Sequence, residues 1–462
     1  MNSISTSSKT WTVGVARRII TPGNHVELAG LGYYLQRTPT SVRDNLTATA
    51  MVIEDSAGKA VALIALDIMY GDESFTSTIR DHICRHTNLT PAAICVNCSH
   101  SHNAANAAFV RGVGELNPEY VQFVARSAAE AAVEAWQTRQ AARLRVGSGE
   151  AKGMAFNRTR ENGPVDTRLS VLRADTLDGR PLAVAVNFHC HLNAHLEVDL
   201  HAVSRDWSGE VIDQIEAAYP GAIALYLQGT CGDVMIAFDF SSTSRRFEPA
   251  REITRAALAA CEDARLVAGT IDFVTKRVHL PTRRWTMEEI NSDREEALYR
   301  LKTGDTNNWL TGFARVIVTY PDRLPRRYGG SVEKTVAAVS RFGVEWTEAM
   351  LPILNTRPEL IETEVQAIRL GDVWLTAHSS ELFTSLGLKV RQNWPHQDLF
   401  MLGYSNGALG YLPDAHDVER KSYAANQSPK FSGQFPFTSE SGQTMVDALL
   451  AALSSAAGNT KA

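Results

Sequence analysis

Two pairs of histidines are the side chains in this sequence whose spacing best suits metal chemistry. His100 and His102 are separated by one serine and follow the apolar run 94–98. His189 and His191 have the same spacing and follow the apolar run 183–188. Residues two apart on an extended segment point to the same side, so both imidazoles of a pair can face one cleft. One pair alone is equally compatible with a polar surface loop, but two pairs at strand ends predict a metal site, because neutral imidazole is a common metal ligand.

Other candidate functional residues lie in loops, at the ends of predicted strands or before a predicted helix. Arg158 lies in the polar loop 156–160, where a solvated surface charge is the simpler interpretation. Asp206 precedes a helical pattern and suits a helix cap as well as a catalytic carboxylate. The loop 229–234 holds two glycines around Thr230 and Cys231, and its exposed amides suit an anion or an oxyanion. No partner histidine pattern accompanies Cys231, so a nucleophilic thiol is not favoured.

These polar residues need a scaffold of alternating strands and helices. Apolar or alternating patterns predict strands at 13–21, 60–67, 94–98, 143–150, 169–173, 183–188, 222–228 and 373–377. Helical patterns predict helices at 74–86, 118–138, 286–301 and 382–391, and a further helix that follows Asp206 and runs to about residue 218. This order indicates an α/β fold, in which ligands bind beyond the carboxyl ends of the strands. The glycine turn 29–34 lacks the third glycine and the following helix of a dinucleotide site, so it is better suited to close backbone approach to a ligand.

Composition and charge exclude several classes of protein. The chain has 462 residues, 44% hydrophobic and 21% charged, which is ordinary for a soluble globular protein. The net charge of -5 comes without any basic block, so nucleic acid is not an expected partner. No apolar run could span a membrane, and residues 1–9 lack the apolar core of a secretory signal. The six cysteines form no dense framework and predict reduced thiols in the cytoplasm, with Cys95 and Cys98 packed in the core.

The order of the motifs along the chain resembles a known family. The sequence shows a glycine turn after the first strand, His-x-His, Asn-Arg, Asn-Phe-x-Cys-His, Ser-x-Asp-Trp-x-Gly and Gln-Gly-x-x-Gly-Asp, then a late Glu and a late Gly-Tyr. This series is similar to the catalytic N-terminal domain of the neutral/alkaline non-lysosomal ceramidases, over about residues 12–423. The resemblance implies one catalytic domain over residues 10–462, with mixed β-sheets flanked by helices. It also implies hydrolysis of an amide with one zinc ion.

The resemblance also implies roles for individual residues. The zinc ligands it implies are His100, His191, Glu381 and Tyr411. Glu381 is expected to begin the helix 382–391. The catalytic residues it implies are His102 as a neighbour of the metal, Arg158, and Tyr423 at the carbonyl oxygen, while Asp233 is expected as a base. Two imidazoles, a carboxylate and a phenol together suit Zn²⁺.

Departures from the family pattern point away from ceramide. The family has a serine two positions after the Gly-Asp loop, and Met235 stands there in this sequence. A thioether cannot replace that hydroxyl. The chain also stops before an immunoglobulin-like C-terminal domain. Together these differences predict a smaller, soluble substrate. His189, His195 and His201 also depart from the pattern, and suit surface positions, substrate binding or a second metal.

One segment, 283–346, matches none of these motifs. It is rich in arginine and aromatic residues, and Thr286 with Glu289 resembles a capping box. A cap beside the site and a peripheral helical insert fit it equally well. As a cap, its Arg326 and Arg327 would select an anionic group on the substrate.

The leading functional hypothesis is a zinc-dependent hydrolase that cleaves an amide C–N bond of a small soluble substrate. The alternatives are a metal-assisted lyase, an ester or lactone hydrolase with a tyrosine as acid or base, and a catalytically silent metal-binding homologue.

Overall fold

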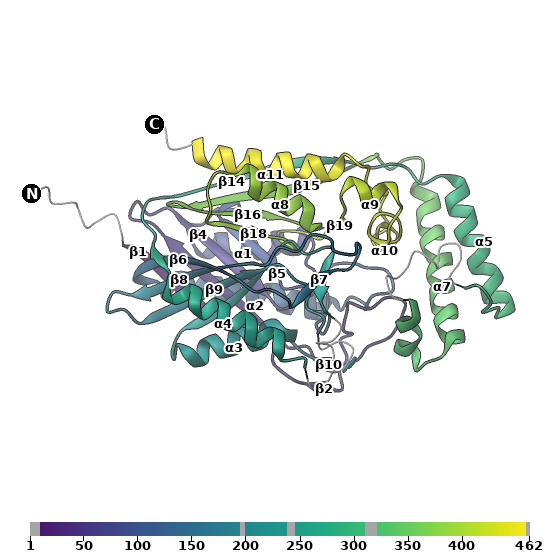
Figure 1. Ribbon diagram of the computed structural model, residues 1–462, viewed down its shortest axis with the longest axis horizontal. Coiled ribbons are helices and arrows are strands. Elements are labelled where there is room, and N and C mark those ends of the chain that lie inside the picture. The colour runs from purple at the N-terminus through teal and green to yellow at the C-terminus, as the bar shows by residue number, and fades with distance from the viewer. Residues whose placement is uncertain (1–9, 195–198, 238–244, 310–320, 459–462) are drawn as a thin grey trace, which may run out of the picture.

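The computed structural model describes residues 10–194, 199–237, 245–309 and 321–458 (Figure 1). His195 lies outside these ranges. Within them, the largest sheet has nine strands in the order β11-β9-β8-β6-β1-β3-β4-β5, with β13 paired to β6. Their bounds are β1 Trp11–Ile19, β3 Thr47–Glu54, β4 Ala60–Leu66, β5 Ile94–Cys98, β6 Gln140–Glu150, β8 Arg168–Thr176, β9 Pro181–Phe188, β11 Ile223–Gln228 and β13 Arg265–Leu266. The pairs β4–β5 and β9–β11 are parallel and the others antiparallel, so the sheet is mixed.

The two ends of this sheet order meet in space. Oδ1 of Asn97 in β5 accepts a hydrogen bond from the Gln228 amide of β11 at 2.7 Å, and its Nδ2 donates to the Gln228 carbonyl at 3.2 Å. A short bridge between Ser101 and Leu192 continues this contact beyond β5 and β9. The segments that follow these strands, with both histidine pairs, are therefore adjacent.

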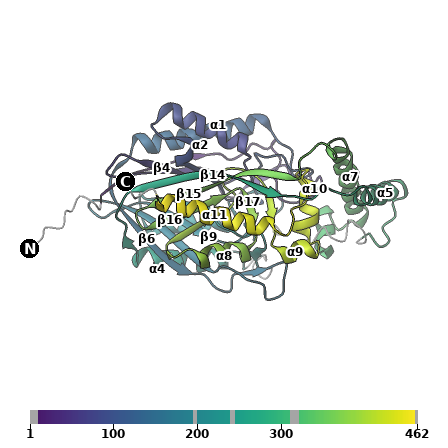
Figure 2. The same ribbon diagram turned by 90° about the horizontal axis from the view of Figure 1, so that it is seen from above.

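Two pairs of helices flank the sheet on opposite sides of the molecule (Figure 2). α1 (Glu73–His86) and α2 (Pro118–Gln137) pack together on one side, with α2 against β1 and β3. α3 (Asp206–Ala218) and α4 (Glu248–Glu262) pack together on the other side, with α4 against β6 and β8. α2 begins where the Asn117 side chain accepts from the Tyr120 amide, and it buries a row of alanines that allow close approach to the strands.

A second sheet has the order β14-β15-β16-β18. Its strands are β14 Ile271–Pro281, β15 Leu360–Leu370, β16 Val373–His378 and β18 Leu399–Leu402. The helices α8 (Thr384–Asn393) and α11 (Ser441–Gly458) pack on it, and their apolar faces form a second hydrophobic core. The remaining short pairs are β2 (Ser41–Val42) with β10 (Ala202–Val203), β7 (Ala155–Asn157) with β12 (Val234–Ile236), and β17 (Ser380–Leu382) with β19 (Gly410–Leu412).

The segment 283–346 forms two packed helices at one end of the molecule, α5 (Met287–Thr303) and α7 (Val332–Met350) (Figures 1 and 2). The expected capping box is present: the Thr286 hydroxyl accepts from the Glu289 amide at 3.1 Å, and the Glu289 carboxylate accepts from the Thr286 amide at 3.0 Å. The short helices α9 (Ala415–Glu419) and α10 (Ser428–Phe431) lie between this pair and the sheets (Figure 1). The remaining short helices are η2 (Pro91–Ala93), η4 (Pro321–Tyr328), η5 (Leu351–Ile353) and η6 (Tyr423–Gln427).

The predicted fold class, α/β with mixed sheets flanked by helices, is confirmed. Cys95 and Cys98 are buried in β5, as expected of core cysteines. The predicted position of Glu381 at a helix start is wrong: Glu381 lies in β17, whose backbone pairs with β19, and α8 begins only at Thr384. Among the described residues, no helix combines the length and apolar character needed to cross a bilayer.

Candidate metal site and cavity

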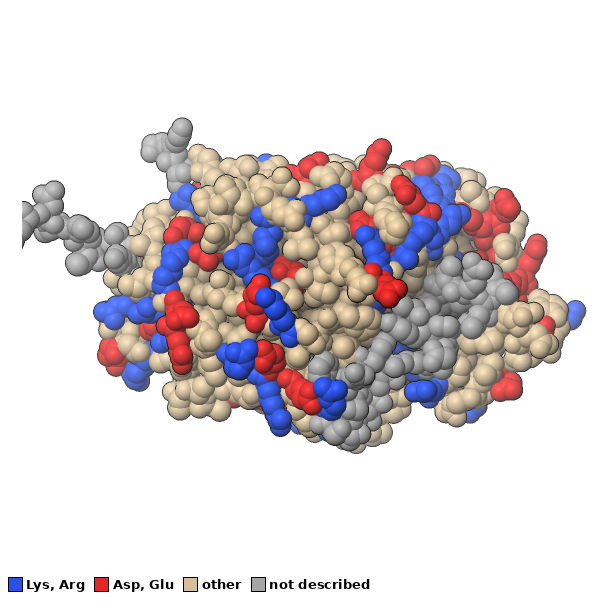
Figure 3. Space-filling model, in the orientation of Figure 1, with Lys and Arg blue, Asp and Glu red and all other residues tan. Residues whose placement is uncertain are grey.

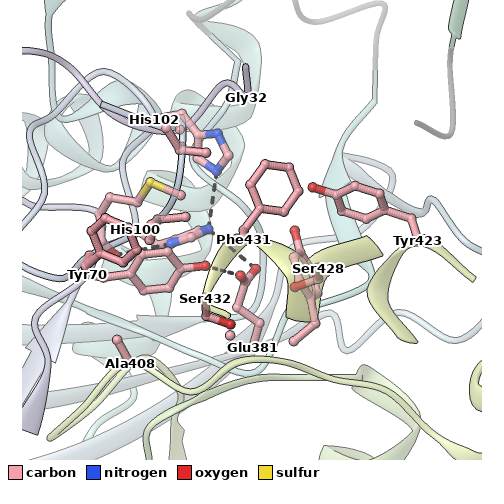
Figure 4. Close-up of a pocket in the computed structure, with 17 residues that line it drawn as sticks. Gly32, Tyr70, His100, His102, Glu381, Ala408, Tyr423, Ser428, Phe431 and Ser432 are labelled. Carbon is pink, nitrogen blue, oxygen red and sulfur yellow. Dashed lines mark hydrogen bonds and ion pairs between the residues drawn. The ribbon is translucent and has the colours of Figure 1, made fainter. Parts of the chain in front are cut away.

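A cavity of about 90 Å³ lies beyond β5, with walls from parts of the chain that are far apart in sequence. Its lining includes Gly30, Met69, Tyr70, His100, His102, Phe109, Val110, Glu381, Tyr411, Tyr423, Ser428 and Phe431. Most predicted site residues therefore converge on one space. Figure 4 shows the two histidines and Glu381 grouped on one side, with Tyr423 and Phe431 facing them.

His100 and His191 present the same ring nitrogen to the same oxygen. His100 Nδ1 lies 3.2 Å from the Met69 carbonyl, and His191 Nδ1 lies 2.8 and 2.9 Å from the carbonyls of Cys231 and Val234. A carbonyl oxygen only accepts, so each Nδ1 carries the proton and each Nε2 keeps a lone pair. Those Nε2 atoms lie 3.5 and 3.2 Å from Oε2 of Glu381.

His102 was expected only as a neighbour of the metal, and it lies within the group of candidate ligands. Its Nε2 is 3.2 Å from His100 Nε2, and the ligand atoms of His100, His102 and His191 all lie within 4.8 Å of one another. Tetrahedral Zn²⁺ with bonds of 2.0–2.1 Å separates its ligand atoms by about 3.3 Å. The separations of 3.5 and 3.2 Å from Glu381 Oε2 to the Nε2 atoms of His100 and His191, and of 3.2 Å between the Nε2 atoms of His100 and His102, are close to this value.

Burial sets the protonation of the three histidines. It lowers the pKa of His100 and His191 to about 3, and of His102 well below its usual value. In the metal-free protein all three imidazoles are therefore neutral at pH 7. Neutral imidazole is the form that binds a metal.

Tyr411 and Arg158 form a second part of the site. The Arg158 guanidinium donates to the Tyr411 hydroxyl and, at 2.9 Å, to the Gly232 carbonyl. Tyr411 stands opposite Glu381 in the β17–β19 pairing, and its ring meets that of Tyr423 edge-on at 5.9 Å. Burial raises the pKa of Tyr411 well above its usual value, although Arg158 opposes the shift, and raises that of Tyr423 to about 12. Both phenols thus carry their protons at neutral pH in the metal-free protein.

Asp233 is not brought to the cavity. Its Oδ1 accepts from the amide and hydroxyl of Thr384 at 2.7 and 2.8 Å, and its Oδ2 accepts from Asn157 at 2.6 Å. These bonds join the loop after β11 to the start of α8. Met235 lies beside it in β12, bridged to His191 through the backbone, and its side chain does not line the cavity either.

Two of the additional histidines, His189 and His201, lie apart from the cluster. His189 Nδ1 accepts from the Thr230 amide at 3.0 Å, and its Nε2 lies 3.6 Å from the Asp166 carboxylate and 3.3 Å from Arg391. His201 contacts the Thr38 carbonyl at 3.0 Å.

Asp206 is the first residue of α3, and its carboxylate accepts from the amides of Trp207 and Ala194. These bonds give Asp206 a structural part at the start of the helix.

Sequence reasoning missed two tyrosines at the cluster. The Tyr70 hydroxyl donates to Glu381 Oε1, and the Tyr404 hydroxyl donates to Glu381 Oε2 at 3.4 Å. Their rings pack against His100 with centroid distances of 4.8 and 4.4 Å. Tyr70 follows a buried strand within a few residues, and that position was the signal that could have identified it.

The segment 283–346 contacts the cavity wall from behind. Phe342 of α7 packs against Tyr33 and Phe431, with centroids 5.2 and 4.6 Å apart, and the Tyr328 hydroxyl donates to the Tyr33 carbonyl at 2.7 Å. Arg326 is exposed, and neither it nor Arg327 lines the cavity.

Comparison with known proteins shows similarity in structure alone. No protein-family model matches the sequence, and no curated protein matches it. The neutral ceramidase from Pseudomonas aeruginosa is similar in structure, with a TM-score of 0.69 at 15% identity over 97% of this chain and 75% of that one. A structure described as ceramidase complexed with C2 gives a TM-score of 0.70 at 14% identity over 98% and 76%. The chain therefore has a neutral-ceramidase-like fold, as the motif order predicted.

Proposed function

We propose that this protein is a zinc-dependent hydrolase that cleaves an amide C–N bond in a small soluble substrate. The observation that carries the proposal is the convergence of the Nε2 atoms of His100 and His191 on one oxygen of Glu381, with each Nδ1 engaged by a backbone carbonyl. Nitrogen and oxygen donors at these spacings suit Zn²⁺. His100, His191 and Glu381 would hold the ion, and Tyr411 and His102 are the adjacent donors.

A zinc ion in this place would polarise a carbonyl and make a water more acidic. His102 is neutral and reaches the same space, so its ring is placed to contact the attacking water, although burial, which holds its pKa well below the usual value, makes it a weak base. Tyr423 lines the opposite wall with its proton retained, and is suited to donate a hydrogen bond to the carbonyl oxygen of the substrate. Arg158 orients the Tyr411 hydroxyl by donating to it. Asp233 is the residue whose expected role as a base has least support, because its oxygens are engaged elsewhere.

The proposed substrate is small and polar. The cavity volume of about 90 Å³ suits a compact group. Met235, in the place of the family serine, has no hydroxyl and does not line this cavity. The proposal assigns the protein no nucleic-acid or membrane partner, which agrees with the mixed charges on the face in Figure 3 and the net charge of -5. It places the protein in the cytoplasm, where the six free thiols would stay reduced.

A second candidate is an ester or lactone hydrolase, or a lyase, in which a tyrosine acts as acid or base. It is favoured by the direct contact of Arg158 with the Tyr411 hydroxyl, because an adjacent guanidinium stabilises a phenolate.

The test starts with the metal content of purified protein, followed by assays of chelated and zinc-restored samples. The substrates are small N-acyl compounds and lactams, small esters and lactones, and a fluorescent short-chain ceramide. We expect bound zinc and zinc-dependent turnover of a small amide. Turnover of the esters or lactones alone supports the second candidate. Robust turnover of ceramide that survives in Met235→Ala contradicts the expected substrate size, and metal binding without any turnover supports a silent homologue.

A further inference from the structure

Tyr70 touches two candidate metal ligands that come from different parts of the chain. It lies in the connection between β4 and α1, is 6% exposed, and lines the cavity beside His100 (Figure 4). Its hydroxyl donates to Glu381 Oε1, and its ring packs against the imidazole of His100 at 4.8 Å. Tyr70 and Glu381 are 311 residues apart in sequence.

This contact makes the two oxygens of Glu381 unequal. Oε1 is occupied by the Tyr70 hydroxyl, while Oε2 faces His191 Nε2 at 3.2 Å and His100 Nε2 at 3.5 Å. A carboxylate that binds a cation with both oxygens must turn both toward it. With Oε1 held by a phenol, Oε2 is the oxygen that Glu381 presents to the two imidazoles.

The ring of Tyr70 restrains a second ligand at the same time. His100 packs against the rings of both Tyr70 and Tyr404, whose own centroids are 6.4 Å apart. Its Nδ1 is engaged by the Met69 carbonyl, the residue that precedes Tyr70. The Met69 carbonyl therefore sets the tautomer of this imidazole, and the rings of Tyr70 and Tyr404 restrain its plane.

We propose that Tyr70 is the positioning residue of this metal site, and that it commits Glu381 to coordination through one oxygen. The inference rests on the proposed function, because it assumes that the cluster binds a divalent cation. Hydrogen-bond partners of metal ligands commonly contribute 10–100-fold to metal affinity. Tyr70 is not one of the proposed ligands, so its effect would be on the affinity for the cation and on its coordination number.

The closing experiment compares zinc affinity among tyrosine-to-phenylalanine variants. Wild type, Tyr70→Phe, Tyr404→Phe and Tyr120→Phe are stripped of metal, and zinc is titrated against a chromogenic chelator. Phenylalanine keeps the ring, so each variant reports the hydroxyl alone. Tyr120 is the matched control, since it is also buried but donates at 2.7 Å to the Ile20 carbonyl, away from the cluster.

We expect Tyr70→Phe to weaken zinc binding by about 10–100-fold. Tyr404→Phe should weaken it less, because its bond to Oε2 is longer, and Tyr120→Phe should leave it unchanged. Cobalt-substituted samples add a second readout: freeing Oε1 lets Glu381 bind with both oxygens, which raises the coordination number and weakens the visible absorption. A purely structural role would not change that spectrum.

A wild-type measurement keeps the inference testable if Tyr70→Phe folds poorly. Infrared difference spectra with and without zinc should show widely separated carboxylate stretches, as one-oxygen coordination requires. Closely spaced stretches, or equal zinc affinity and equal cobalt spectra for wild type and Tyr70→Phe, overturn the role of Tyr70 alone. A wild-type protein that binds no zinc overturns the proposed function, and the role of Tyr70 with it.

Discussion

The two sides of the cavity are built in different ways. On one side, the metal cluster (His100, His191 and Glu381) stands on short segments that directly follow or form strands, and its side chains are at most 1% exposed. On the other side, the aromatic wall (Tyr33, Phe342 and Phe431) joins a loop, a helix of the 283–346 segment and α10 through ring contacts. Backbone ladders position the cluster, and side-chain packing positions the wall.

This difference predicts that the cluster controls metal binding and turnover, and that the wall controls the shape of the cavity. The backbone of a ligand at a strand end is held by hydrogen bonds along the strand, so it moves little when one neighbouring side chain changes. A wall of packed rings changes shape when one ring or anchor is altered. We therefore expect changes in the cluster to remove metal and activity, and changes near the wall to alter substrate affinity first.

The largest effect should come from His191→Ala. Removing one of two imidazoles that face Glu381 should abolish zinc binding at micromolar metal and lower activity by more than about 100-fold, as with other essential ligands. Metal analysis and steady-state kinetics measure this. His189→Ala is the matched control, since it deletes a buried imidazole two residues away that faces Asp166 instead. Wild-type zinc content in His191→Ala would show that His191 is not a ligand.

Gly30→Ala should displace His102 and leave the three cluster residues in place. A Cβ on Gly30 would lie 2.8 Å from the Cα, Cβ and Cγ atoms of His102, and the Gly30 φ of +104° already disfavours a side chain. We expect activity to fall by up to about 100-fold, the cost of a misplaced catalytic group, with zinc content retained.

Gly153→Ala is the control for the Gly30 variant. The φ of Gly153 is +76°, and an added Cβ meets no atom within 4 Å. The alanine at this position therefore has the unfavourable backbone conformation but no steric clash. Equal kinetics for the two variants would show that the position of His102 does not matter to turnover.

Lys430→Met should disturb the wall rather than the cluster. Lys430 is 2% exposed, its Nζ lies 2.5 Å from the Asp293 carboxylate, and the rings of Trp285 and Trp346 lie 5.4 and 5.0 Å from it. Loss of the lysine leaves Asp293 buried without its cation, which costs about 3–5 kcal/mol of unfolding free energy. Since Phe431 follows Lys430 in α10, we also expect KM to rise more than kcat falls.

Denaturant unfolding, kinetics and zinc content test the Lys430 variant. Lys421→Met is the control, because Lys421 is exposed and lies 3.9 Å from Glu289. If Lys430→Met lost zinc and kept its KM, the aromatic wall would control metal binding rather than substrate affinity, which contradicts the proposed comparison.

Acid should destabilise the metal-free protein through its buried histidines. Burial lowers the pKa of His378, in the strand before Glu381, to about 3, against 6.5 in the unfolded chain. Between these values the unfolded chain binds the additional proton, so stability is complete above pH 6.5 and falls as the pH drops toward 3. Each such histidine contributes about 1.4 kcal/mol per pH unit. Urea unfolding with a chelator, from pH 7 to 4.5, should show a slope smaller by about one proton in His378→Gln, and equal slopes would contradict the assignment.

The smallest effect should come from the charges of η4. If the 283–346 segment selects an anionic group, Arg326→Ala combined with Arg327→Ala should raise KM a few-fold for anionic substrates and leave neutral ones unchanged. Screened surface charges contribute at most about 1 kcal/mol. Kinetics on matched anionic and neutral amides measure the difference, and an unchanged KM for both would place this segment outside substrate recognition.

The sequence determined the local features of this protein. Apolar runs predicted β4, β5, β9 and β11 within a few residues, and the pairs of histidines were expected at strand ends, where His100 and His191 are found. The capping box at Thr286 depends on residues three apart and was predicted and found. Strand periodicity, caps and turns arise from interactions within a few residues, so a single sequence is enough to identify them.

Only the tertiary structure decided which of these features meet. The contact of His191 with Glu381 spans 190 residues and that of Tyr70 with Glu381 spans 311, so no local pattern contains either. The same packing turned Asp233 toward Thr384 and His189 toward Asp166. The sequence alone had allowed Asp233 as a catalytic base and His189 as a ligand of substrate or metal. Which side chains share a cavity depends on how the ends of the sheet join, through Asn97 and Gln228, and on how β17 pairs with β19. These long-range pairings depend on the free energy of the whole fold. The sequence around each site residue therefore does not reveal them.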